Sequence, residues 1–143
     1  MKNSVMLLLI IFSISAFGQN ADTVPSEKLV FTQVEQMPEF PGGINSLMAY
    51  LGSNIHYPKT AIENCATGTV YLKFIVEEDG TIGENVLVVK GVGYGCDEES
   101  VRVVSAMPKW TPGKQNGKPV SVYYTLPVKF ALDDCTKKVK TDN

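Results

Sequence analysis

The most regular pattern along the chain is the alternation of strongly apolar with more polar side chains in residues 68–76 and 120–130. This period of two predicts β-strands that bury one face and expose the other. Asp79-Gly80 follows the first strand and is a strong hairpin signal, so a return strand is expected to run to about Lys90. The residues expected on the buried faces are Val70, Leu72, Phe74, Val76, Val120, Val122, Tyr124, Leu126, Val128 and Phe130.

Three other segments carry helix signals. In residues 44–51 the apolar positions recur three and four apart, and Gly52 is a stop signal. Pro58 suits the first turn of a second, short helix over residues 59–63. A third helix is expected at Asp97, because aspartate is a natural N-cap residue and the two glutamates that follow it are favoured by the helix dipole.

The order of these elements after residue 55 is helix, strand, strand, helix, strand. A right-handed crossover through the last helix places the third strand beside the first. The expected fold class is therefore α+β, a small antiparallel sheet of order 2-1-3 with two or three helices packed on one face. The weaker strand pattern of residues 29–36 allows an additional N-terminal strand. An edge position for the third strand agrees with Pro127, because proline cannot donate to a sheet ladder.

Both ends of the chain differ in composition from the rest. Residues 1–18 combine a lysine, an apolar run of 13 residues and small side chains at Ala16 and Gly18, as in a secretory signal peptide. The apolar run is shorter than the roughly 20 residues that span a membrane. The remaining segments are expected to be a flexible lead over 19–30, the folded domain over 31–132 and a polar tail over 133–143.

Composition and charge narrow the class of function. Apolar residues make up 44% and charged residues 20% of the 143 residues, as in an ordinary globular domain. The formal charge is −2 and Arg102 is the only arginine, so nucleic acid is not an expected partner. His56 is the only histidine, and the carboxylates at 77–79 lie in a predicted turn. We therefore expect no enzymatic activity, no catalytic or metal-binding set and no cofactor.

The three cysteines allow at most one disulfide within a monomer. An exported location permits such a bridge. In sheet order 2-1-3, Cys65, Cys96 and Cys135 all flank strand ends at one rim of the sheet. A bridge that uses Cys65 is expected, and Cys135 is favoured over Cys96 because its strand neighbours the first strand directly.

Short motifs of glycine, proline and aromatic residues follow one another along the chain. They are Pro41-Gly42-Gly43, Tyr57-Pro58-x-x-Ala61, Gly68-x-Val70, Asp79-Gly80, Met107-Pro108-x-Trp110-x-Pro112-Gly113, Gly117-x-Pro119-Val120 and Leu126-Pro127-Val128-x-Phe130. In this order they resemble the C-terminal domain of TonB and its relatives, over about residues 31–132. The resemblance implies a non-enzymatic periplasmic domain that pairs its edge strand with an extended peptide of an outer-membrane receptor.

The expected contact surface is the last strand, where an incoming peptide would meet backbone groups and outward side chains. The partner is expected to be an outer-membrane TonB-dependent receptor or another protein with an extended segment. A structural protein that forms a homodimer through the same edge is the alternative. The expected partner-binding residues are Val120, Ser121, Val122, Tyr123, Tyr124 and Thr125, and structural roles are expected for Trp110, Pro112, Gly113 and Pro127.

The signal-peptide hypothesis is tested by the mass of the exported protein. Cleavage after Gly18 leaves Gln19 at the N-terminus, where glutamine can cyclise. Mass spectrometry of the mature protein is expected to find this terminus. An intact Met1 in the membrane fraction would contradict the prediction.

Overall fold

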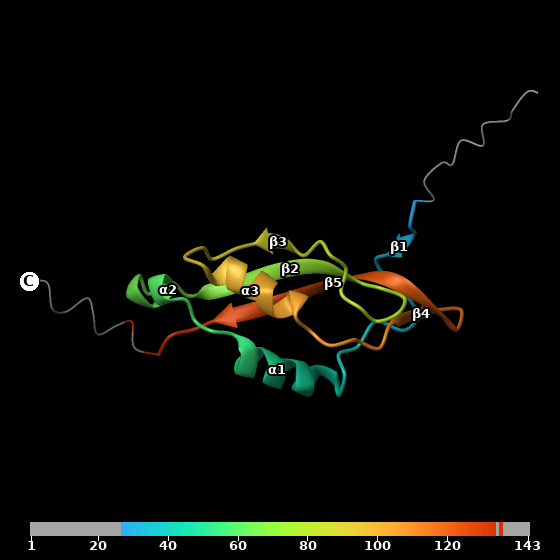
Figure 1. The fold of residues 1–143 in the computed structure, drawn as a ribbon, viewed down its shortest axis with the longest axis horizontal. Coiled ribbons are helices and arrows are strands. Elements are labelled where there is room, and N and C mark those ends of the chain that lie inside the picture. The colour runs from blue at the N-terminus through green and yellow to red at the C-terminus, as the bar shows by residue number, and fades with distance from the viewer. Residues whose placement is uncertain (1–26, 134, 136–143) are drawn as a thin grey trace, which may run out of the picture.

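The computed structural model describes residues 27–133 and 135, which form a sheet with helices against one face (Figure 1). The α+β fold expected from the sequence is confirmed. The expected signal peptide lies outside the described residues, as do most of the lead and of the tail. The elements are β1 (Val30–Phe31), α1 (Gly43–Asn54), α2 (Lys59–Glu63), β2 (Gly68–Val76), β3 (Leu87–Lys90), α3 (Cys96–Ser105), β4 (Gly113–Gln115) and β5 (Lys118–Phe130).

The two longest strands, β2 and β5, form the centre of the sheet. They make nine consecutive antiparallel pairs, from Gly68 opposite Phe130 to Val76 opposite Val122. β3 pairs antiparallel with the other edge of β2, so these three strands have the predicted order. The even-numbered side chains of β2 from Val70 to Val76 and of β5 from Val122 to Phe130 form about half of the core, and the odd-numbered ones lie on the opposite, open face.

Two short strands make the sheet differ from the expected three-stranded, all-antiparallel arrangement. β1 pairs in parallel with β5, with Val30 opposite Ser121 and Phe31 opposite Val122. β4 forms a hairpin with the start of β5, where Gly113 lies opposite Val120. The sheet is therefore mixed, with the order β1-β5-β2-β3. β1 lies within residues 29–36, where the sequence allowed an additional strand, whereas the three residues of β4 are too few to produce a readable alternation and were not predicted.

The third helix begins differently from the prediction. Gly95, with φ of 86°, is the N-cap of α3, and Asp97 lies inside the first turn. The carboxylate of Asp97 accepts hydrogen bonds from the backbone N–H groups of Val92 (2.8 Å) and Gly93 (3.3 Å). The aspartate therefore fastens the loop before α3 and does not cap the helix. A glycine supplies the left-handed conformation instead.

Trp110 is the centre of an aromatic cluster under the sheet. It is 3% exposed and its ring lies 4.8 Å from Tyr124, 5.7 Å from Phe40 and 5.8 Å from Phe74, measured between centroids. Its backbone N–H donates to the carbonyl of Gly80 (2.8 Å). Gly80 has φ of 87°, and a Cβ there would lie 2.0 Å from the carbonyl oxygen of Trp110. The hairpin after β2 is thus held against the segment that leads into β4.

A charged cluster joins the end of α1 to α3. The Glu99 carboxylate accepts hydrogen bonds from the His56 backbone N–H (2.8 Å) and from Nε (2.9 Å) and Nη2 (2.6 Å) of Arg102. Arg102 also donates to the carbonyl of Asn54 (2.9 Å). Hydrogen bonding to Arg102, together with that from His56, lowers the pKa of Glu99 to about 2. The charged form of Glu99 is therefore the form that holds these helices together.

Replacement of Glu99 tests this contact. Because the folded-state pKa is depressed, the stabilisation is fully present above the ordinary glutamate pKa and is lost as pH falls from about 4.5 toward 2. Glu99→Gln is expected to lower the free energy of unfolding at neutral pH by about 1–2 kcal/mol, and the difference from wild type should vanish near pH 2. Urea denaturation at several pH values measures it, with the adjacent exposed Glu98→Gln as the control. Equal effects of the two substitutions would contradict the prediction.

The disulfide joins Cys65 to Cys135, the pairing that the strand order favours. Their Cα atoms are 5.5 Å apart and 70 residues separate them in sequence, so the bridge ties the chain before β2 to the chain after β5. Cys96 is the free cysteine and is fully buried at the start of α3. Closure of a loop of this length stabilises by roughly 4 kcal/mol through its effect on the unfolded chain.

Thiol alkylation distinguishes this arrangement from a Cys65–Cys96 bridge or from three free thiols. The native, non-reduced protein is expected to react at no cysteine, because two are bonded and the third is buried. After unfolding in denaturant without reductant, one thiol should be labelled, and peptide mapping should place it at Cys96. A label at Cys65 or Cys135 under those conditions would contradict the bridge.

Candidate functional site

The two edges of β5 have different environments. One edge is paired with β2 over residues 122–130. On the other, β1 occupies the positions of Ser121 and Val122. The first three residues of β5 pair with β4 in a hairpin. Within the described part of the chain, residues 123–130 pair with no strand besides β2. An eight-residue stretch of backbone is therefore open for pairing.

Pro127 determines which backbone groups point to this open edge. In an antiparallel ladder, alternate residues direct their N–H and C=O groups to opposite edges. Pro127 has no N–H and lies opposite Tyr71, inside the continuous pairing with β2. The ladder is therefore complete only if the even-numbered residues bond to β2. Tyr123, Thr125 and Lys129 then each present a donor and an acceptor at the open edge, and Pro127 presents an acceptor alone.

Three of the six expected contact residues lie beside other strands of the same chain. Val120, Ser121 and Val122 were expected to meet a partner, but Val120 is paired with β4 and the other two have β1 beside them. Ser121 is 3% exposed and its hydroxyl donates to the Glu77 carboxylate (2.7 Å). β4 leaves no signal in the apolar pattern, and the weak strand pattern of residues 29–36 does not indicate that β1 pairs at these positions.

The other three expected contact residues lie on the open stretch. Tyr123 and Thr125 are on the open face of the sheet, and the Lys73 ammonium lies 4.4 Å from the Tyr123 ring centroid. Tyr124 points to the opposite side, against Trp110, and its burial raises the pKa of its phenol. The open edge therefore begins with one tyrosine on each face of the sheet.

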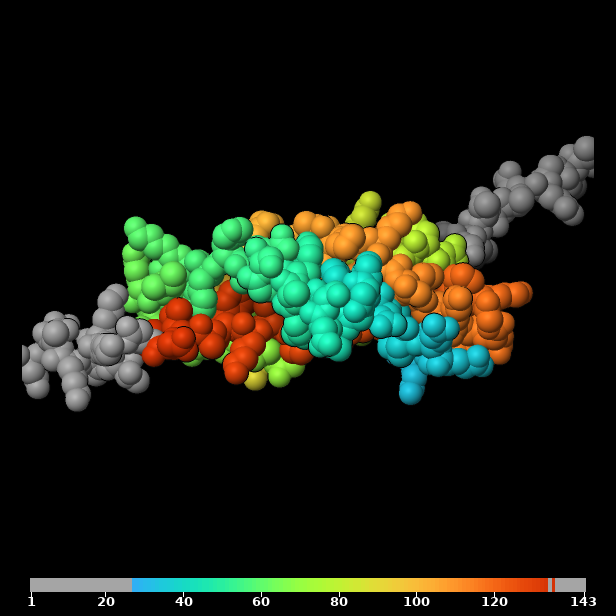
Figure 2. Space-filling view, turned by 90° about the horizontal axis from the view of Figure 1, so that it is seen from below, coloured from blue at the N-terminus to red at the C-terminus, as the bar shows by residue number. Residues whose placement is uncertain are grey.

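A hollow of about 280 Å³ lies between α1 and the open edge. It is lined by Met48, Leu51, Gly52 and Ile55 from α1 and its C-terminal end, and by Pro127, Val128 and Lys129 from β5. Figure 2 shows α1 (teal) beside the C-terminal part of β5 (red). Met48 is 49% exposed, and a Cβ at Gly52 would meet no atom within 4 Å. The lining is thus mostly apolar, with Lys129 as its one charged residue, and there is room for a side chain at Gly52.

The sequence contains a partial signal for this hollow. Ile44, Met48 and Gly52 are four residues apart and share a helix face, but the spacing alone does not separate core-facing from exposed positions. Leu47 and Leu51 are buried, whereas Ile44 is 58% exposed. The apolar face of α1 is wider than the part that the core buries. Its exposed part includes Met48, which lies beside β5.

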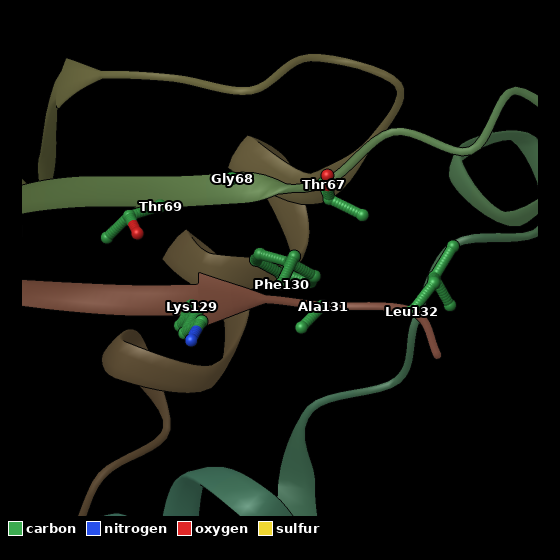
Figure 3. Close-up of a pocket in the computed structure, with 7 residues that line it drawn as sticks. All are labelled: Thr67, Gly68, Thr69, Lys129, Phe130, Ala131 and Leu132. Atoms are coloured by element: carbon green, nitrogen blue, oxygen red, sulfur yellow. The ribbon is translucent and has the colours of Figure 1, made fainter. Parts of the chain in front are cut away.

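A second hollow, of about 320 Å³, lies at the ends of β2 and β5 (Figure 3). Its lining runs from Thr67 to Thr69 and from Lys129 to Leu132, and the side chains of Thr69 and Lys129 come from neighbouring strands. Lys129 is the one charged residue in this lining. The hollow therefore brings together no pair of groups suited to acid–base chemistry or to holding a metal ion.

The residues with intrinsic reactivity are occupied in other ways. His56 is part of the contact with Glu99 and Arg102. Burial, with Asp97 and Glu98 nearby, raises the pKa of the Cys96 thiol, so its thiolate is disfavoured. In residues 27–133 and 135, no three His, Cys, Asp or Glu side chains are grouped so as to hold a metal ion.

The geometry described so far is that of an α+β domain whose last strand has an open edge. The chain belongs to the family described as the Gram-negative bacterial TonB protein C-terminal, whose profile matches residues 53–132. β1 and most of α1 precede the matched segment.

Two solved structures are similar to this chain, and both are solution NMR structures of the Helicobacter pylori TonB C-terminal domain. The first is 19% identical with a TM-score of 0.48, and the alignment covers 63% of this chain and 94% of that one. The second is 21% identical with a TM-score of 0.46, and covers 66% and 88% respectively. None of the curated proteins matches the chain. Among the described residues, no helix is both long and apolar enough to cross a membrane.

Proposed function

We propose that this protein is a periplasmic binding domain that captures an extended peptide by adding it as a strand to β5. The partner is an outer-membrane receptor of TonB-dependent transport, or another protein with an exposed extended segment. The observation that carries the proposal is the open edge of residues 123–130, which lies next to an apolar hollow. Family membership supports a role in TonB-dependent transport.

The energetics of such capture come first from the backbone. A peptide paired with the open edge meets the donors of Tyr123, Thr125 and Lys129 and the acceptors of these residues and Pro127. Each backbone hydrogen bond contributes about 0.5–1.5 kcal/mol net. Several bonds together are therefore enough for recognition that is largely independent of β5 side chains, and side-chain contacts add selectivity.

Proline substitution tests the mechanism because it removes a backbone donor and blocks the approaching strand. Tyr123→Pro is expected to abolish binding of a partner that the wild-type domain retains from outer-membrane extracts. The matched control is Leu87→Pro, on β3 at the far edge of the sheet, where Leu87 lies opposite Lys73. Its folded fraction should bind as wild type does. Circular dichroism reports folding, and titration with the purified partner reports the dissociation constant.

A folded Tyr123→Pro protein that binds with wild-type affinity would refute edge pairing. Sedimentation at several concentrations examines self-association through the same edge. If the wild-type protein is a dimer, Tyr123→Pro is a monomer and no partner is retained, the homodimer is favoured over peptide capture.

A further inference from the structure

We propose that the open edge selects a segment in which apolar and acidic residues alternate near Pro127 and Lys129. This inference rests on the proposed capture of an extended peptide, and it names the chemistry of that peptide. It follows from the two surfaces that border the edge, the hollow beside α1 and the open face of the sheet. Successive side chains of an added strand point to opposite faces, so they meet these two surfaces in turn.

The inner surface is apolar. A side chain of the added strand that points toward α1 enters the hollow lined by Met48, Gly52 and Ile55. There is open space at the lining residue Gly52, since a Cβ there has no atom within 4 Å. A branched apolar side chain fills this space and removes exposed apolar surface of Met48 from water. A charged side chain at the same position would lose hydration among these apolar side chains, and Lys129 is the one charged residue of the lining.

The outer surface is positively charged around the same place. On the open face, Lys129 lies opposite Thr69 and Lys73 lies opposite Thr125. Lys90 lies opposite Tyr71, which in turn is paired with Pro127. The charged residues of these cross-strand pairs are therefore all lysines, although the chain as a whole has a formal charge of −2.

The carboxylates of this face are at the other end of the sheet. Glu77 and Glu84 line a hollow near Ile75, and Glu77 is already paired with Lys28 and Ser121. The open face thus has a basic end at Lys129 and an acidic end beyond Ile75. An added strand places an outward residue next to Lys129, and opposite charges in neighbouring strands attract. The outward residue next to Lys129 is therefore the acidic residue of the proposed segment.

Three capped seven-residue peptides provide the probe: Thr-Val-Glu-Val-Glu-Val-Thr and its versions with glutamine or lysine in place of both glutamates. The glutamate peptide is expected to bind about tenfold more tightly than the lysine peptide at low salt, and the glutamine peptide between them. Lys129→Glu should reverse the order, and added salt should reduce the preference. The control is Lys118→Glu, an exposed lysine of the same strand that lies within the β4 hairpin.

The hollow is tested by filling it from the protein side. Gly52→Leu is expected to weaken all three peptides about tenfold, because the leucine occupies the space of the incoming apolar side chain. The thermal stability of the protein should be retained, since Gly52 is inside α1 and has room for a side chain. Ser53→Leu, at the next exposed helix position, is the matched control and should leave the affinities unchanged.

Two failures are distinguishable. If the glutamate and lysine peptides bind equally and neither Lys129→Glu nor Gly52→Leu changes their affinity, the selection of an acidic and apolar segment is wrong. Loss of glutamine-peptide binding in Tyr123→Pro would then still support edge capture. If no peptide binds to the wild-type domain, or if Tyr123→Pro binds all three as wild type does, edge capture itself is overturned.

Discussion

The nine antiparallel pairs between β2 and β5 are the interaction on which the rest of the structure depends. They align the alternating apolar side chains of two strands on a single face, and the helices and Trp110 pack against that face. The same pairing occupies one edge of each strand. β3 then covers the second edge of β2, whereas β1 and β4 cover only the beginning of β5. The open edge is thus a direct result of the mismatch between a thirteen-residue strand and its short neighbours.

The elements that can be predicted from sequence are those whose own residues repeat a pattern. The alternation in β2 and β5 predicts their faces, and Pro127 indicates an edge strand by itself because it lacks a ladder donor. The start of α3 cannot be obtained in this way, because Asp97 bonds to the Val92 loop instead of the helix end. The Asp97 carboxylate can accept hydrogen bonds either from the helix end or from the loop before it. Only the folded path of the loop decides which of the two forms.

The site is less predictable than the fold for a related reason. Ser121 and Tyr123 occupy equivalent positions in the alternation, yet β1 covers the first and leaves the second free. The hollow beside α1 depends on the distance between a helix and a strand that are over seventy residues apart in the chain, and no local pattern carries that information. The cysteine pairing is partly accessible, because strand order favours Cys135 over Cys96 as the partner of Cys65 without excluding Cys96.

Because β1 covers the beginning of β5, the open edge starts at a fixed residue. The edge therefore has a defined length. A strand rises about 3.3 Å per residue, so eight residues from Tyr123 to Phe130 accommodate roughly 26 Å of extended chain. A longer segment has to bend away from the sheet at Phe31 or displace β1. If an added segment shifts by two residues toward β1, it loses a pair with β5. If it shifts the other way, it extends past the end of β5, where the disulfide to Cys135 follows. For the proposed capture, the fold therefore limits the register of the segment at both ends.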